Sequence, residues 1–198
     1  MRDAVIEPSW TGLRVLARVE TGSTKLVDED GIDCTDEFAE VAEALSAAAL
    51  ADELILDGYL TIEATQATVG VSQPLPGAPS VPEAMRQLLV GTRRPRRAER
   101  DRPLDLERPI AFVSVDLLVV DGTRLLDVPL LERKRLLDGA LRVGELVRIT
   151  PYCRAPIGQY VSTWRSLGFR EMVCKGSNSH YLPGARNDEW SIMSLPAS

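Results

Sequence analysis

Side chains that could act as nucleophiles or metal ligands are scarce in this chain and lie far apart. Its single histidine is His180, and only three of its 23 basic residues are lysines. The lysines and cysteines are Lys25, Lys134, Lys175, Cys34, Cys153 and Cys174. Because no C-x-x-C pair occurs and one histidine cannot form a ligand pair, the sequence predicts neither a metal site nor a disulfide framework.

Composition and charge limit the class of protein. The 198 residues are 44% hydrophobic and 26% charged, values that are typical of a soluble globular protein and exclude a mainly disordered or fibrous one. No apolar run is long enough to span a membrane, and the opening residues are too few and too acidic for a signal peptide. We therefore expect a cytoplasmic protein with no membrane partner. The net charge of -6 argues against a strongly basic nucleic-acid coat, but it allows a local basic patch.

Such a patch lies in a polar insertion at residues 92–108, which we expect to be mobile. Its candidate DNA-binding residues are Arg93, Arg94, Arg96, Arg97, Arg100 and Arg102. One interpretation is a clamp on the phosphate backbone, with an affinity that falls steeply with salt. The other is a solvated loop of the kind that this composition favours. No aromatic residue interleaves the arginines, so base stacking is not indicated.

Hydrophobic periodicity predicts strands and helices that do not alternate strictly, which favours an α+β fold with mostly antiparallel sheets. We expect one domain over residues 1–198, with Thr35 as the N-cap of its first helix. The expected strands are 14–20, 24–27, 54–62, 110–120, 146–150, 171–174 and 190–193. The expected helices are 36–50, 82–90, 129–140 and 156–167, and residues 65–80 are expected to form a loop.

Several segments, taken in order, resemble the motifs of one family. They are Glu7-Pro8-Ser9-Trp10-Thr11-Gly12-Leu13-Arg14, Asp28–Thr35, Leu56-Asp57-Gly58-Tyr59-Leu60, Phe112–Leu118, Pro129–Arg133, Met172–Lys175 and Ser179–Trp190. They are similar to E-P-K-W-D-G-x-R, S-R-N-G-x-D-x-T, L-D-G-E-L, F-x-x-F-D-L-L, a P-L-L-E-R stretch, E-G-L-V-A-K and the stretch that leads into D-W-x-K-x-K. The chain thus resembles the adenylation (nucleotidyltransferase) domain of ATP-dependent DNA ligases, especially bacterial end-joining ligases.

This resemblance implies the ATP-grasp-like nucleotidyltransferase fold of DNA ligases, in which two antiparallel sheets are flanked by helices and nucleotide binds between them. ATP and magnesium are the cofactors of that family. A complete ligase continues into an OB-fold domain. Because this chain stops at Ser198, we expect the OB domain to be absent.

The departures from the family pattern fall on its reactive positions. The nucleophilic lysine is replaced by Ser9, whose hydroxyl cannot form the phosphoramidate that the reaction requires. Lys25 and Lys134 lie in unrelated segments, and Lys175 matches a different family lysine. The other replacements are Thr11, Glu29, Tyr59, Val115, Arg170, Ile192 and Ser194. With phosphate-binding cations, metal-supporting carboxylates and the base-stacking aromatic gone, we predict no catalytic residue, no metal site and no bound cofactor.

Three residues could remain from a nucleotide site. Glu7 and Arg14 match family positions near the base and the ribose or phosphate, and Lys175 could meet an anion. The alternative is an ordinary salt bridge for Glu7 and Arg14 and a solvated side chain for Lys175. Asp57-Gly58 is interpreted as a strand bend, and His180 as a hydrogen-bonding residue of a loop.

Three functions are compatible with these observations. The first is a ligase-like module that has lost self-adenylation and ligation and binds DNA ends or nicks, or end-joining repair proteins. The second is a protein-interaction scaffold without nucleic-acid binding, which the acidic charge favours. The third is an ATP-dependent DNA ligase subunit that is active only with a partner, which Ser9 disfavours.

Overall fold

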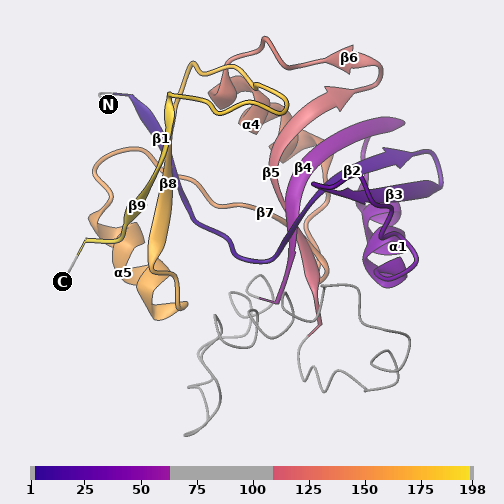
Figure 1. Ribbon diagram of the computed structural model, residues 1–198, viewed down its shortest axis with the longest axis horizontal. Coiled ribbons are helices and arrows are strands. Elements are labelled where there is room, and N and C mark those ends of the chain that lie inside the picture. The colour runs from indigo at the N-terminus through magenta and orange to yellow at the C-terminus, as the bar shows by residue number, and fades with distance from the viewer. Residues whose placement is uncertain (1–2, 63–108, 197–198) are drawn as a thin grey trace, which may run out of the picture.

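The computed structural model describes residues 3–62 and 109–196, and these residues form two sheets with three helices (Figure 1). In chain order the elements are β1 (Ala4–Pro8), β2 (Leu13–Glu20), β3 (Ser23–Asp28), α1 (Ala39–Ala48), β4 (Glu53–Thr61), β5 (Ala111–Val120), β6 (Thr123–Arg124), α4 (Leu130–Ala140), β7 (Val147–Ile149), α5 (Gly158–Ser166), β8 (Glu171–Gly176) and β9 (Trp190–Ser194). None of the helices within the described ranges is long and apolar enough to cross a membrane.

The larger sheet has the strand order β3-β2-β4-β5-β6, and its neighbouring strands are antiparallel. β7 also joins β5 and runs parallel to it, which is the one parallel pair among the described strands and is compatible with the expected mostly antiparallel sheets. Alternate residues of β2, Val15, Ala17 and Val19, are buried, as the period of two requires. They pack in one core with Leu45 of α1 and Leu137 of α4.

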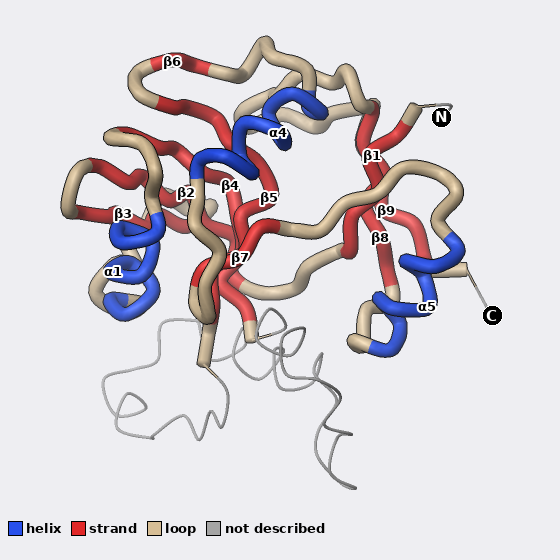
Figure 2. The backbone as a smooth tube through the Cα atoms, turned by 180° about the vertical axis from the view of Figure 1, so that it is seen from behind, coloured by secondary structure: helices blue, strands red, loops and turns tan. Residues whose placement is uncertain are grey.

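The smaller sheet has the strand order β1-β8-β9 and is antiparallel throughout. Figure 2 shows it beside the larger sheet, with α5 next to β8. Its own core is built around Trp164 of α5 together with Phe169 and Met172. Two sheets with flanking helices are therefore present, and the expected α+β architecture is confirmed.

The loop after β8 joins the two sheets at the N-terminus of α4. The first-turn amides of this helix have no partner inside the helix. The amide of Leu130 donates to the carbonyl oxygen of Ser179 at 3.0 Å, and that of Leu131 donates to the carbonyl oxygen of Ser177 at 3.0 Å. The loop that follows β8 of the smaller sheet therefore holds α4, a helix that packs on the larger sheet.

Some local expectations were wrong, and others concern residues that the structure does not describe. Thr35 is not an N-cap, because α1 begins at Ala39 and the Thr35 hydroxyl is already used: it accepts from the Leu26 amide and donates to Asp33. The helix is accordingly shorter than the expected 36–50. The expected loop at 65–80, the expected helix at 82–90 and the arginine-rich insertion lie outside the described residues.

Candidate functional site

A buried carboxylate at the end of β1 is the centre of the site. Glu7 is 1% exposed and meets two lysines from different elements. Lys134 Nζ of α4 lies 2.5 Å from Glu7 Oε1, and Lys175 Nζ of β8 lies 3.0 Å from Glu7 Oε2. The Lys134 contact is an ion pair without good hydrogen-bond alignment, because Lys134 directs its hydrogen bond to the Val115 carbonyl oxygen at 2.6 Å. Lys134 therefore links the two sheets.

The three charges of this cluster shift one another's pKa values. Burial alone would raise the pKa of Glu7, but the charges of Lys134 and Lys175 outweigh it and lower the pKa below its ordinary value of 4.5. Burial lowers the pKa of Lys134 by more than Glu7 restores. For Lys175 the attraction of Glu7 and Asp116 outweighs burial, and its pKa is raised. Glu7 is thus a carboxylate anion held between amines, and a weak base.

A second buried pair lies beside the first. Arg133 and Asp116 are both fully buried and make a two-pronged contact, with Nε donating to Oδ1 at 2.9 Å and Nη2 to Oδ2 at 2.8 Å. Nη1 of the same arginine donates to the carbonyl oxygens of Val128 and Ser179. This pair therefore fixes α4, β5 and the loop after β8 to one another. Charge-assisted bonds of this geometry are among the strongest in proteins.

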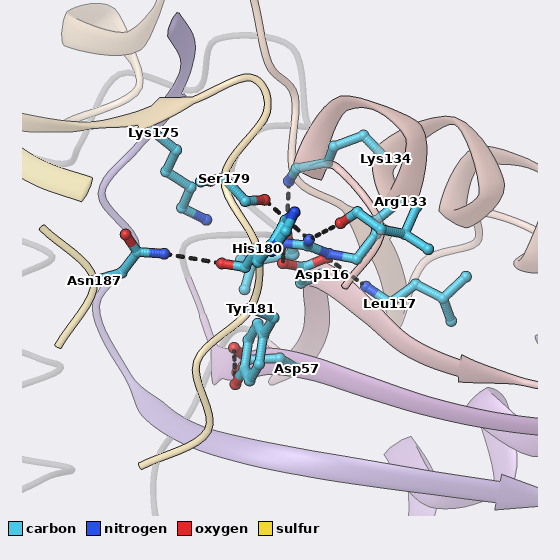
Figure 3. Close-up of polar contacts among 12 residues, drawn as sticks. Asp57, Asp116, Leu117, Arg133, Lys134, Lys175, Ser179, His180, Tyr181 and Asn187 are labelled. Atoms are coloured by element: carbon cyan, nitrogen blue, oxygen red, sulfur yellow. Dashed lines mark hydrogen bonds and ion pairs between the residues drawn. The ribbon is translucent and has the colours of Figure 1, made fainter. Parts of the chain in front are cut away.

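A third pair faces solvent on one side. Asp57 of β4 accepts from Arg14 of β2 through both carboxylate oxygens, at 3.0 and 2.7 Å, and its Oδ2 also accepts from the Tyr181 hydroxyl at 3.0 Å. Hydrogen bonding to Asp57 raises the pKa of Arg14, and burial together with the Asp57 charge raises the pKa of Tyr181. Figure 3 shows the Tyr181 ring against Asp57, with Arg133 and Lys134 reaching in from α4 and Lys175 from β8.

The bend expected at Asp57-Gly58 is present as a register shift between β4 and β5 at these two residues. Glycine is required there, because a Cβ on Gly58 would lie 2.4 Å from the Phe112 ring and 2.5 Å from the Val113 carbonyl oxygen. Asp57 does more than bend the strand, since it binds Arg14 and Tyr181. That role was not anticipated from the sequence.

The structure brings two of the three candidate nucleotide residues together. Glu7 and Lys175 form an ion pair, while Arg14 pairs with Asp57 and not with Glu7. The alternative of a solvated Lys175 is wrong: it is 5% exposed, and its ammonium lies 4.6 Å from the centre of the Trp190 ring. The six arginines from Arg93 to Arg102 lie outside the described residues.

Lys134 is the residue of the candidate site that sequence reasoning missed, because it was assigned to an unrelated segment. The signal was available in the spacing of α4. Leu130, Arg133, Lys134 and Leu137 lie at positions i, i+3, i+4 and i+7 and are all buried. Two basic residues on the apolar face of a helix must have buried acidic partners.

Most of the replaced family positions are half-buried or exposed. Ser9 is half-buried and its amide donates to the Glu171 carbonyl oxygen at 3.0 Å. Tyr59 is half-buried on β4, and burial raises the pKa of its phenol. Ile192 and Ser194 are exposed on β9.

His180 lies in the loop after β8, where its carbonyl oxygen accepts from the Asn187 side chain at 2.9 Å. Among the residues that the structure describes, no group of three acidic, histidine or cysteine side chains is placed to hold a metal ion.

Comparison with known proteins gives consistent matches. The family model of the ATP dependent DNA ligase domain matches residues 1–192. A probable DNA ligase of Streptomyces coelicolor is 30% identical over 192 residues, which are 94% of this chain and 34% of that protein. A multifunctional non-homologous end joining protein LigD of Mycobacterium bovis is 24% identical over 93% of this chain and 20% of its own length.

Solved structures agree on the fold. The ligase domain of Mycobacterium tuberculosis LigD superposes with a TM-score of 0.64 at 22% identity, covering 96% of this chain and 53% of that one. A mycobacterial DNA ligase D complexed with ATP and MES also has a TM-score of 0.64 at 22% identity, covering 94% of this chain and 52% of that one. The chain spans about a third or less of the curated relatives it matches and about half of these structures.

Proposed function

Because this chain belongs to the ATP-dependent DNA ligase domain family, we propose that it is a ligase-derived module that no longer transfers AMP to itself and that binds DNA ends. The observation that carries the first half is Ser9 at the position of the nucleophilic lysine. A serine hydroxyl needs a strong base to become a nucleophile. The carboxylate two residues away, Glu7, is a weak base because Lys134 and Lys175 stabilise its charged form.

The two lysines of the site are poor substitutes for the missing amine. Lys134 is 0% exposed and donates to the Val115 carbonyl oxygen, so a phosphate cannot approach its nitrogen without opening the core. Lys175 is 5% exposed and is kept protonated by Glu7, and a protonated amine has no lone pair with which to attack.

The residues present do not fit an ATP–magnesium complex. Magnesium is bound mainly through carboxylates and phosphates, and the carboxylates of the described site, Glu7, Asp57 and Asp116, are each paired with one or two cations. Tyr59 replaces a further carboxylate of the family pattern. On the phosphate side, the two lysines expected on β9 are Ile192 and Ser194. We therefore expect ATP to bind no tighter than about 1 mM, which is roughly 4 kcal/mol.

The second half of the proposal rests on the family and on the arginine-rich insertion. Relatives named as end-joining proteins act at DNA ends, and six arginines in ten residues could bind a phosphate backbone. The test is fluorescence anisotropy with labelled nicked, blunt-ended and intact duplexes at low and near-physiological salt. We expect tighter binding to nicks or ends than to intact duplex at both salt concentrations.

A matched pair of variants separates the insertion from general charge. Replacing the six arginines with glutamine should remove most of the binding. Replacing the exposed Arg135 and Arg142, in and just after α4, with glutamine should leave the affinity for DNA within about twofold of that of the unmodified protein. Lack of DNA binding even at low salt would overturn the DNA-binding half of the proposal and leave the adenylation half untouched.

A second candidate function, a protein-interaction module without nucleic-acid binding, is favoured by one surface. The segment from Asp28 to Glu43 carries eight acidic residues, and no basic residue occurs between Lys25 and Arg86. At the turn Asp28–Gly31 this chain has Glu29 where the family pattern has arginine. Such a surface repels phosphate. Capture of a protein partner together with absent DNA binding would favour this candidate.

A further inference from the structure

β9 ends the smaller sheet with an open edge. The described residues pair β9 only with β8, so its other side has no strand partner among them. Natural sheets protect such edges with charged residues, proline or bulges. The sequence of β9, Trp-Ser-Ile-Met-Ser, contains none of these. Two lysines would protect it in the family pattern, and this chain has Ile192 and Ser194 in their place.

Alternation along β9 shows which backbone groups face the open edge. The Leu195 amide donates to the Arg170 carbonyl oxygen at 2.8 Å, and the Gly176 amide donates to the Glu189 carbonyl oxygen at 3.0 Å. In an antiparallel ladder only every second residue bonds a given neighbour. The odd-numbered residues of β9 therefore face β8, and the amide and carbonyl groups of Ile192 and Ser194 face outward, as does the carbonyl group of Trp190.

Apolar side chains accompany these open groups. Ile192 is 64% exposed and Met193 is 51% exposed, and they point to opposite faces of the sheet because they are adjacent in a strand. An edge that offers both hydrogen-bonding groups and apolar surface is suited to the addition of another strand.

We infer that β9 is a homodimerisation edge, on which a second copy of this chain adds its own β9 in antiparallel orientation. The strand is self-complementary about Ile192. A two-fold axis midway between the two copies of Ile192 places Ile192 opposite Ile192 of the other copy, Ser191 opposite Met193, and Trp190 opposite Ser194. The two Ile192 residues exchange two hydrogen bonds, and each Ser194 amide meets a Trp190 carbonyl oxygen. The Trp190 amide is not needed, since it already donates to the Asn187 carbonyl oxygen at 3.1 Å.

Charge favours this occupant and this orientation. β9 itself is uncharged, so two copies do not repel each other along the paired strands. The acidic residues Asp188 and Glu189 precede β9, and Arg170 lies beside the opposite end of the strand, next to Leu195. Antiparallel pairing brings the acidic end of one copy to the basic end of the other, whereas parallel pairing would bring acid to acid.

The result is a continuous six-stranded sheet. The pairing of five residues per copy is small compared with the ~1,200 Å² of a stable specific interface. We therefore expect a reversible dimer with a dissociation constant of roughly 10–500 μM.

Sedimentation equilibrium over about 5–500 μM protein tests this range. The expected result is an average mass that rises from one copy toward two. The variant Ile192→Lys/Ser194→Lys restores the residues of the family pattern and places like charges opposite each other, and it should stay at the mass of one copy throughout. Val143→Lys is the matched control, because Val143 is 53% exposed and lies between α4 and β7, and this variant should associate like the unmodified chain.

Cysteine substitution tests the register. Paired Cα atoms at Ile192 would be about 5.5 Å apart, which suits a disulfide, so Ile192→Cys should form a covalent dimer under mild oxidation. Met193→Cys should not, because its two copies would be offset by two residues and lie more than about 7 Å apart. The native cysteines are buried and do not compete. A monomer at all concentrations without an Ile192→Cys disulfide would overturn the inference, and an extended segment of another protein would then be the fitting occupant of this edge.

Discussion

The site has an inner part of buried charged residues and an outer part of half-buried or exposed positions, and the two parts differ in which residues of the ligase pattern this chain keeps. In the inner part the charged residues of the ligase pattern are present and buried, as Glu7, Asp57, Asp116, Arg133 and Lys175 show. The charged positions of the pattern that have changed all lie in the outer part: Ser9, Thr11, Glu29, Tyr59, Arg170, Ile192 and Ser194. Val115 is the exception, being a buried replacement, but it exchanges one apolar side chain for another.

The cost of losing a charge explains this difference. Removing one partner of a buried ion pair leaves an unpaired charge in a low-dielectric interior and destabilises a protein by about 3–5 kcal/mol. Changing an exposed residue usually alters stability by no more than about 0.5 kcal/mol. The inner charges are therefore required by the fold, whatever the protein does. The outer positions carry no such constraint from the fold.

The largest effect is expected at the Arg133–Asp116 pair. Arg133→Met should lower the free energy of unfolding by about 3–5 kcal/mol, because Asp116 is left buried and unpaired. Arg135→Met is the control on the same helix. Its ion pair with Glu132 is exposed, so the loss should be below about 1 kcal/mol. Urea unfolding of both variants measures the difference. Equal losses in the free energy of unfolding would show that the buried Arg133–Asp116 pair stabilises the fold no more than the exposed pair does.

Glu7→Gln should have the next largest effect, about 3 kcal/mol at neutral pH, because Lys134 and Lys175 lose their shared carboxylate. The effect should depend on pH. Glu7 has a lowered pKa in the folded state, so its stabilisation is present above the unfolded value near 4.5 and is lost as the pH falls through the folded pKa. The variant should therefore show a shallower loss of stability in acid than the unmodified protein. Parallel pH profiles would contradict the ion-pair assignment.

An intermediate effect is expected at the rim of the inner part. Tyr181→Phe removes the hydroxyl that donates to Asp57 and should cost about 1–2 kcal/mol, because the bond is to a charged group that keeps Arg14 as a second partner. Tyr160→Phe on the exposed side of α5 is the control and should leave the free energy of unfolding unchanged. An unchanged free energy of unfolding for Tyr181→Phe would show that its hydrogen bond to Asp57 does not stabilise the fold.

The smallest effect is expected in the outer part. Ile192→Lys should change the free energy of unfolding of the monomer by no more than about 0.5 kcal/mol, because the side chain is already exposed. Measurement at low micromolar protein keeps any association out of the result. A loss above about 2 kcal/mol would show that outer positions are also constrained by folding.

Local pattern was sufficient to predict most of the described strands and helices. Alternation in β2, and the Asp121-Gly122 turn, which has φ of 45° and 75°, are properties of neighbouring residues. The parallel pairing of β7 with β5 and the start of α1 depend on distant contacts. The Thr35 hydroxyl, for example, is hydrogen-bonded to Leu26 and Asp33. The local sequence signals for the start of a helix do not include these two partners.

The candidate site was harder to predict because burial is a property of the whole fold. In the sequence, Lys175 resembles a solvated residue at a strand end. In the fold, β1 and the Trp190 ring cover it. Lys134 resembles a surface residue until its helix is placed on β5. The family resemblance assigned the replaced positions in the sequence, but only the fold shows that most of them are half-buried or exposed.

The buried charges of the ligase pattern remain in this chain, and we propose that its adenylation reaction has been lost. Intact-mass spectrometry after incubation with ATP and magnesium tests it most directly, with an active DNA ligase as the positive control. We predict no AMP adduct on the unmodified chain. We also predict none on Ser9→Lys, because Tyr59, Ile192 and Ser194 still lack the family's charges. Stoichiometric addition of one AMP to the unmodified chain would contradict the account.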